Sequence, residues 1–348
     1  MKGQLRFGVV GAGRVAQSYV QAFEDHHGAR IVAVADIRTD AASALAEALG
    51  CEWYNSYEAM AERSTQDAVI ICTPPATHPE VCLHFLKRKV HVLCEKPLSI
   101  DAESARKMAN AAAEAGVMLT MASKFRYVDD VVRAKSMVLS GALGEIALVE
   151  NAFTSRIDMS SRWNSNPTIS GGGVLIDHGT HSVDLMRYFL GPIAEVHCAE
   201  GGRSQAIEVE DSVLVLVRNA RGVMGIIDLS WSIEKRRDSY VDIYGTHGAI
   251  SVGWRESKYR EWSRRDWVVF GNGYNKIQAF RDQINNFSKA IRGQEALLIT
   301  TEDALASVEV IEAAYTALAR QSWTPVGQQT ASRETPDGHV FIQAEEKQ

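Results

Sequence analysis

The sequence has few cysteines, no long apolar run and no surplus of basic residues, and each absence excludes a class of protein. Its five cysteines are scattered over 348 residues without a Cys-x-x-Cys pair, which argues against a disulfide framework or a zinc ribbon. The sequence contains no run of about 18 apolar residues, so no membrane-spanning helix is expected. The net charge is −6, from 37 basic and 43 acidic residues, so no basic surface is expected for nucleic acid or anionic lipid.

The N-terminal stretch MKGQLRFGVVG enters a strand-like run directly, without the apolar segment of a secretion signal. We therefore expect a cytoplasmic protein with reduced cysteines. The 46% of hydrophobic and 23% of charged residues are typical of a globular chain, and the length predicts two domains. A small molecule is the expected ligand.

Short apolar runs alternate with helical segments over the first third of the chain. This alternation is typical of a parallel sheet covered by helices on both faces, which is a doubly wound α/β domain of the Rossmann type. The expected strands are residues 5–11, 31–36, 67–75, 90–97 and 117–122, and the expected helices are 14–26, 39–50, 77–89 and 101–116.

The remainder of the chain contains mostly strand signals separated by short turns. These signals predict a C-terminal α+β domain on a mostly antiparallel sheet. We expect domains at 1–123 and 124–325, and an extension at 326–348 with a short strand at 339–343. The expected strands are 145–155, 194–202, 211–219, 222–232, 239–245 and 248–253, and the closing helices are 275–291 and 302–320.

The stretch GVVGAGRVAQ places Gly11-x-Gly13-x-x-Ala16 between the first strand and the first helix. In a dinucleotide-binding domain the first glycine makes a tight turn, the second admits a pyrophosphate and the small third residue lets helix and strand pack closely. Arg14 and Val15 begin the helix whose N-terminus would face the phosphates. A glycine turn without a ligand is the alternative.

Asp36 ends the next strand, 20 residues after Ala16. An acidic residue at this place accepts hydrogen bonds from the adenosine ribose, and its charge favours NAD over NADP. Ile37 and Arg38 follow it and are expected beside the cofactor. Arg38 keeps NADP open as an alternative, unless it is only a surface arginine.

Two further segments end predicted strands at the same sheet edge. Thr73, Pro74 and His78 belong to CTPPATH, and Glu95 and Lys96 belong to CEKP. Ligands of such sheets lie across the carboxyl ends of the strands, so all five are expected near the cofactor. A proline turn before a helix, or a solvated turn lysine, would need no ligand.

The stretch GGGVLIDHGTH, residues 171–181, places Asp177 and His181 at i and i+4 on one helix face. Gly179 between them costs about 1 kcal/mol relative to alanine in a helix interior. The face could be a solvated polar stripe continued by Asp184 and Tyr188.

A metal site at His178 and His181 is another interpretation of this helix. It lacks a clear third ligand and the His-Glu-x-x-His pattern of a zinc helix. No metal is therefore expected.

From Leu5 to about Trp323, the chain resembles the Gfo/Idh/MocA group of glucose-fructose oxidoreductases and inositol dehydrogenases. The motifs that carry the resemblance are GAGRVA, ADIR, CTPPATH, CEKP, KFRY and GGGVLIDHGTH. It implies an N-terminal Rossmann domain that binds NAD, and a C-terminal domain whose open sheet forms the interface of a homodimer or homotetramer.

The same resemblance implies a catalytic set of Lys96, Asp177 and His181. His181 would exchange a proton with a substrate hydroxyl, and Asp177 would orient the substrate or the base. Lys96, before an often cis prolyl bond, would hold the reacting oxygen. Gly179 would then leave space for the nicotinamide or the substrate.

Residues on the substrate side are expected from KFRY and from the loop before the three glycines. Lys124 and Arg126 follow the last Rossmann strand, and Arg162 and Trp163 would suit a sugar. The implied reaction transfers a hydride between nicotinamide and a secondary alcohol or ketone of a sugar or cyclitol. The alternatives are an NAD-retaining glycoside hydrolase or lyase and a non-catalytic regulator that binds the cofactor.

Overall fold

A computed structural model describes residues 3–24 and 26–327 and divides the chain into two compact units. The first contains the residues up to Val132 together with 168–171 and 274–308. The second contains 133–167, 172–273 and, within the described ranges, 309–327. The division assigns the helix after residue 275 to the first unit, whereas the expected boundary at 123 and 124 assigns it to the second.

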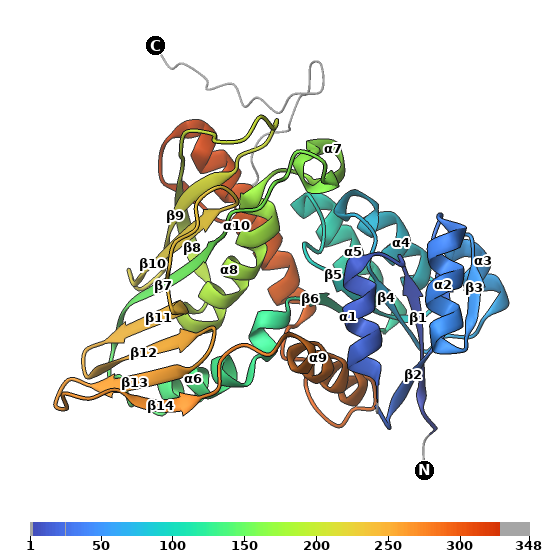
Figure 1. Cartoon of the computed structure of the whole chain (residues 1–348), viewed down its shortest axis with the longest axis horizontal. Coiled ribbons are helices and arrows are strands. Elements are labelled where there is room, and N and C mark those ends of the chain that lie inside the picture. Colours follow the sequence, from blue (N-terminus) through green and yellow to red (C-terminus); the bar gives the residue numbers. More distant parts are fainter. Residues whose placement is uncertain (1–2, 25, 328–348) are drawn as a thin grey trace. The chain divides into compact units, whose positions relative to one another are not determined.

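The first unit is built on a six-stranded parallel sheet in the order β3-β2-β1-β4-β5-β6 (Figure 1). This order confirms the doubly wound fold. The sequence did not predict β3 or the short helix α3, because three and seven residues are too few for a clear periodicity. The strands are β1 (Leu5–Val10), β2 (Ala29–Ala35), β3 (Glu52–Tyr54), β4 (Ala68–Ile71), β5 (His91–Glu95) and β6 (Leu119–Ala122).

Helices cover both faces of this sheet because successive strand residues point to opposite sides. Phe7 and Val9 of β1 belong to a core shared with α1, α2 and α9, whereas a Cβ on Gly8 would meet Met60 of α3. On that second face α4 packs against α3 and α5. The helices are α1 (Arg14–Phe23), α2 (Thr39–Leu49), α3 (Tyr57–Arg63), α4 (His78–Leu86), α5 (Ala102–Ala115) and α9 (Lys276–Ile291).

The helix α9 belongs to the first unit because its apolar stripe completes that core. Phe280 packs edge-on against Tyr19 at 4.7 Å between ring centroids, and Phe287 packs against Phe7 at 6.1 Å. Both phenylalanines are at most 2% exposed. Burial of each ring stabilises the unit by about 1.5 to 3 kcal/mol.

The second unit is built on a nine-stranded sheet in the order β14-β13-β12-β11-β7-β10-β9-β8-β15. Only the β7–β10 pair in this sheet is parallel, which confirms the expected open, mostly antiparallel sheet. The strands are β7 (Ile146–Thr154), β8 (Ile193–Glu200), β9 (Ser212–Asn219), β10 (Met224–Ser230), β11 (Ser239–Gly245), β12 (Gly248–Gly253), β13 (Ser257–Glu261), β14 (Val268–Gly271) and β15 (Thr324–Pro325).

The remaining helices are α6 (Asp129–Leu139), α7 (Pro167–Ser170), α8 (Val174–Leu190) and α10 (Thr301–Arg320), with 3-10 turns at Pro75–Thr77, Lys124–Tyr127 and Trp163–Ser165. Among the described residues, no helix combines the length and apolarity needed to cross a membrane. The five cysteines are unpaired in the structure. The expected strand at 339–343 lies outside the described residues.

Helix α8 packs across β7, β8, β9 and β10 (Figure 1). Gly179 of α8 faces Leu229 of β10. A Cβ on Gly179 would lie 3.1 Å from Leu229 Cδ1, 3.3 Å from Ile311 Cδ1 and 3.4 Å from Leu175 Cδ1. The expectation that Gly179 makes room for nicotinamide or substrate is therefore wrong. The glycine lets the helix approach the apolar core of its own unit.

We expect Gly179→Val to destabilise the protein by about 1 to 3 kcal/mol, because the added methyl groups overpack this core. The matched control is Gly202→Val, since a Cβ at exposed Gly202 meets no atom within 4 Å. Its effect should stay within about 0.5 kcal/mol. Urea unfolding measures both variants, and equal midpoints for the two would contradict the packing assigned to Gly179.

Candidate functional site

The parallel strands of the first unit end in register at one edge of the sheet. Val10 pairs with Ala35 on one side and Ile71 on the other, and Ile71 pairs with Cys94. The segments that follow these four strands are the glycine turn, the Asp36 loop, CTPPATH and the Lys96-Pro97 pair. The fold thus brings the predicted cofactor segments to the edge where ligands of doubly wound sheets bind.

The glycine turn has the backbone that a dinucleotide requires. Gly11 has φ +95°, and a Cβ there would lie 2.8 Å from the carbonyl carbon of Cys72, so only glycine fits. A Cβ on Gly13 would meet nothing within 4 Å. Helix α1 begins at Arg14 without a side-chain cap, and its N-terminal N–H groups and dipole favour an anion.

The carboxylate of Asp36 fixes the glycine turn to the end of β2. Its Oδ2 accepts the Ala12 N–H at 2.7 Å, and its Oδ1 accepts the Arg38 N–H at 2.8 Å. The Arg38 guanidinium lies 3.8 Å from the same carboxylate. Asp36 therefore shapes the turn as well as ending the strand, a role that the spacing did not predict.

A cavity of about 380 Å³ lies beside the glycine turn. Small side chains of α2 leave it open, and two arginines give it positive charge. Val15 packs against the unit's core, and Ile37 is 89% exposed. The lining residues are Ala12, Gly13, Arg14, Gln17, Arg38, Ala41, Ala44, Leu45 and Ala48.

His78 is buried, which contradicts the expected cofactor contact. Its Nδ1 lies 2.8 Å from the Pro97 carbonyl oxygen and its Nε2 lies 2.8 Å from the Thr73 carbonyl oxygen. The residue is 0% exposed and presents no atom to a ligand. His78 instead ties the Thr73 loop to the segment after Lys96, while Thr73 and Pro74 remain half-buried at the edge.

Two carbonyl acceptors require both ring nitrogens of His78 to carry protons, which makes the ring a cation. Burial opposes the charged form, but nearby Cys94 and the two carbonyls favour it and raise the pKa of His78 to about 9. Burial also raises the pKa of the Cys94 thiol well above its usual value. Cys94, the largest of the influences that favour the charged ring, acts together with the two carbonyls.

Glu95 is the buried last residue of β5, and Lys96 follows it directly. The Glu95 carboxylate, 8% exposed, accepts the Tyr19 hydroxyl at 2.9 Å and the Lys96 N–H at 3.2 Å. Tyr19 also donates to Gln283 of α9 at 3.4 Å. Lys96 is half-buried, and its bond to Pro97 is cis, as the resemblance implied. The Glu95 carboxylate thus holds the backbone N–H of Lys96 in place.

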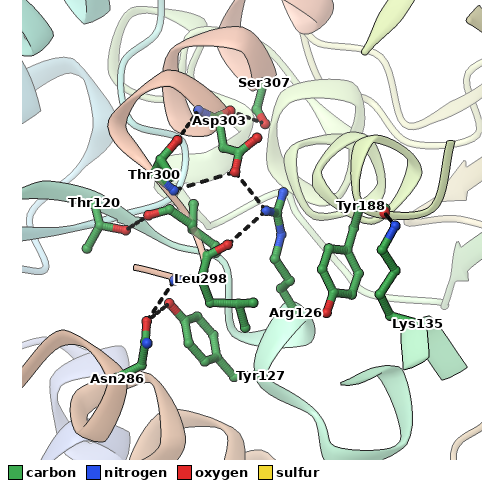
Figure 2. Close-up of polar contacts among 11 residues, drawn as sticks. Thr120, Arg126, Tyr127, Lys135, Tyr188, Asn286, Leu298, Thr300, Asp303 and Ser307 are labelled. Atoms are coloured by element: carbon green, nitrogen blue, oxygen red, sulfur yellow. Dashed lines mark hydrogen bonds and ion pairs between the residues drawn. The ribbon is translucent and has the colours of Figure 1, made fainter. Parts of the chain in front are cut away.

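The KFRY turn is anchored within the first unit (Figure 2). Arg126 Nη1 lies 3.0 Å from Asp303 Oδ2 and donates to the Leu298 carbonyl at 3.1 Å, with only 3% of its side chain exposed. Tyr127 donates to Asn286 at 3.2 Å. These contacts account for the buried position of the Arg126 guanidinium, and no substrate contact is needed to explain it. Lys124 is half-buried and lies 5.0 Å from the Phe125 ring centroid.

Asp177 and His181 lie in the first two turns of α8, within the second unit. The two histidines of this segment lie near an aromatic ring. The centroid of the Phe153 ring is 6.5 Å from that of His181 and 6.4 Å from that of His178. Asp177 Oδ2 is 3.9 Å from His178 Nε2. Asp177 is half-buried and His181 is 5% exposed, so the interpretation as a solvated polar stripe does not describe this helix.

The described ranges contain no group of three His, Cys, Asp or Glu side chains placed to hold a metal ion. Arg162 and Trp163 lie on an exposed turn before α7, with Trp163 45% exposed. Sequence reasoning missed Glu210, which binds the first turn of α8. The signal was present as an acidic pair, Glu210 and Asp211, directly before a buried strand.

We expect His78→Gln to cost about 2 kcal/mol near pH 6, because it removes hydrogen bonds made by a charged ring. The folded pKa is raised, so this contribution is complete below the unfolded pKa of about 6.5 and is lost as pH rises through about 9. Urea unfolding of both proteins across this range measures the difference.

The control is His91→Gln, because burial lowers the pKa of His91 and leaves that ring neutral above pH 7. Its cost should not change between about pH 7 and about pH 10. If the loss of unfolding free energy in His78→Gln is equally constant over this range, the proposed charge on the His78 ring is contradicted.

Comparison with known proteins agrees with this geometry. Residues 5–123 match the GFO_IDH_MocA family, described as an oxidoreductase family with an NAD-binding Rossmann fold, and residues 131–251 match its C-terminal domain. Inositol 2-dehydrogenase of Rhizobium meliloti (strain 1021) is 27% identical over 337 residues, which cover 91% of this chain and 98% of that protein.

The rhizopine catabolism protein MocA of Rhizobium meliloti is 30% identical over 327 residues, covering 91% of this chain and 96% of that protein. The structure of a levoglucosan dehydrogenase in complex with NADH and levoglucosan has the same fold, with a TM-score of 0.87 at 21% identity over 94% of this chain and 100% of that one. The chain belongs to the Gfo/Idh/MocA family of oxidoreductases, with an NAD-binding Rossmann fold.

Proposed function

We propose that the protein is an NAD-dependent dehydrogenase that transfers a hydride between nicotinamide and a secondary alcohol or ketone of a sugar, sugar derivative or cyclitol. The observation that carries the proposal is the shared sheet edge, where Lys96 follows β5 and the glycine turn follows β1. Relatives named inositol 2-dehydrogenase and levoglucosan dehydrogenase support this substrate class.

The residues at the edge of the first unit fit a dinucleotide. The open space at Gly13 and the uncapped start of α1 suit a pyrophosphate, and Asp36 suits an adenosine ribose. When bound, the nicotinamide serves as hydride acceptor or donor. The Asp36 carboxylate disfavours a 2′-phosphate, although Arg14 and Arg38 in the adjoining cavity keep NADP as a second cofactor to test.

Three side chains carry the proton chemistry in this proposal. His181 accepts the hydroxyl proton during oxidation and returns it during reduction, because neutral imidazole is a base suited to neutral pH. The Lys96 ammonium donates a hydrogen bond to the reacting oxygen and stabilises negative charge on it. Asp177 orients the substrate or the imidazole.

Three residues, half-buried Lys124 and exposed Arg162 and Trp163, are assigned to substrate recognition. Lys124 follows β6 at the same sheet edge, and Arg162 with Trp163 supplies a guanidinium and an aromatic face on an exposed turn. Arg126 is not assigned, because its guanidinium is buried against Asp303.

We assign self-association, as a homodimer or homotetramer, to the nine-stranded sheet of the second unit. Large apolar side chains of this sheet are exposed, including Leu214 at 45% and Val269 at 56%. Contiguous exposed apolar patches are typical of protein interfaces, so the proposal requires such side chains to be covered together when copies of the chain associate.

The test is NADH formation with a panel that contains myo-inositol, glucosides and levoglucosan. Lys96→Ala and His181→Gln should each lower kcat by ~10²- to 10⁴-fold, because positioned proton transfer and charge stabilisation are lost. The dissociation constant for NAD should change less than about twofold in His181→Gln. Lys87→Ala, an exposed lysine at the end of α4, is the control and should keep normal turnover.

The outcomes separate this proposal from its rivals. Cleavage of a glycoside without net NADH would favour an NAD-retaining hydrolase or lyase. NAD binding without turnover of any panel member would favour a regulator. Normal turnover in Lys96→Ala would contradict the assigned chemistry.

A further inference from the structure

Glu210 places a buried carboxylate at the start of α8. The residue is 5% exposed and lies just before β9 in the second unit. Its Oε1 accepts three hydrogen bonds: from Gly173 N–H at 2.9 Å, Leu175 N–H at 3.0 Å and the Tyr315 hydroxyl at 2.8 Å. Its carbonyl oxygen accepts the Val174 N–H at 3.0 Å.

A carboxylate in this position needs strong compensation. Burial raises the pKa of Glu210, while hydrogen bonds from Tyr315 and the backbone of Leu175 and Gly173 act in the opposite direction. The N-terminal end of the α8 dipole also favours negative charge. The three donors satisfy one oxygen in a fixed arrangement, so the first turn of α8 has little freedom to shift.

This arrangement explains two of the three consecutive glycines. A Cβ on Gly172 would overlap the Tyr315 hydroxyl, and a Cβ on Gly173 would overlap the Glu210 carbonyl oxygen. The glycines are therefore required by contacts inside the unit, and not by the approach of a ligand.

We propose that Glu210, together with Tyr315, is a positioning residue that sets the direction of Asp177 and His181 by fixing the first turn of α8. Asp177 N–H donates to the Gly173 carbonyl at 3.0 Å, so the residue that Glu210 holds also anchors Asp177. His181 follows one helical turn later. The inference rests on the proposed function, because it assumes that both side chains act on the substrate.

The experiment compares Glu210→Ala with Glu210→Gln in the full-length protein. Both substitutions remove the charge, but the glutamine oxygen can still accept the three hydrogen bonds at the Oε1 position. We expect Glu210→Ala to lower kcat at least ~10-fold, since small displacements of catalytic groups cost up to ~10²-fold. Glu210→Gln should stay within about threefold of the wild type, and NAD affinity should stay within about twofold in both.

Turnover is measured with the panel sugar that supports the fastest NADH formation, well below the unfolding temperature of each variant. Hydrogen–deuterium exchange of residues 174–181 is the second readout, and it does not depend on activity. Exchange should increase in Glu210→Ala and remain unchanged in Glu210→Gln. If Glu210→Ala fails to fold, Tyr315→Phe replaces it, with an expected ~3- to 10-fold loss of kcat and faster exchange over the same residues.

A folded Glu210→Ala protein with normal kcat and normal exchange would overturn the inference, as would a Glu210→Gln protein as impaired as Glu210→Ala. If none of the panel sugars supports NAD reduction by the wild-type protein, the proposed function fails instead. The exchange data would still decide whether Glu210 fixes α8.

Discussion

The parallel register of the six-stranded sheet is the constraint on which the cofactor site depends. Because β1, β2, β4 and β5 end together, four segments far apart in sequence share one edge. Buried polar contacts then fix their shapes: Asp36 closes the glycine turn, and the charged ring of His78 joins the loop after β4 to the segment after β5. The backbone on both sides of half-buried Lys96 is therefore held by buried side chains, Glu95 before it and His78 after it.

In the second unit, helix α8 likewise carries both residues that pack against the core and residues for which we propose a catalytic role. Gly179 faces the apolar core and lets α8 approach the sheet, while Glu210 and Tyr315 hold the first turn of the helix. Asp177 and His181 lie two residues before and two residues after Gly179, on the side of α8 that points away from Gly179. In both units a buried acidic or cationic group with hydrogen-bond partners restrains the backbone next to a residue for which we propose a catalytic role.

The sequence predicted the fold well because its signals are local. Apolar runs alternating with helices indicated the doubly wound sheet, and the glycine spacing indicated the dinucleotide turn. The short elements β3, α3 and β13 to β15 were missed, since a few residues show no clear period. The roles of Gly179, His78 and Glu210 were wrong or absent, because each depends on partners distant in sequence, such as Ile311, Pro97 and Tyr315.

The central claim is that a lysine after β5 and a histidine on α8 serve one substrate oxygen. A crystal structure of the protein with NAD and a sugar it oxidises tests this most directly. The account predicts that Lys96 Nζ and a ring nitrogen of His181 both lie within about 3 Å of the same hydroxyl oxygen. A productive complex in which that oxygen contacts neither side chain would contradict it.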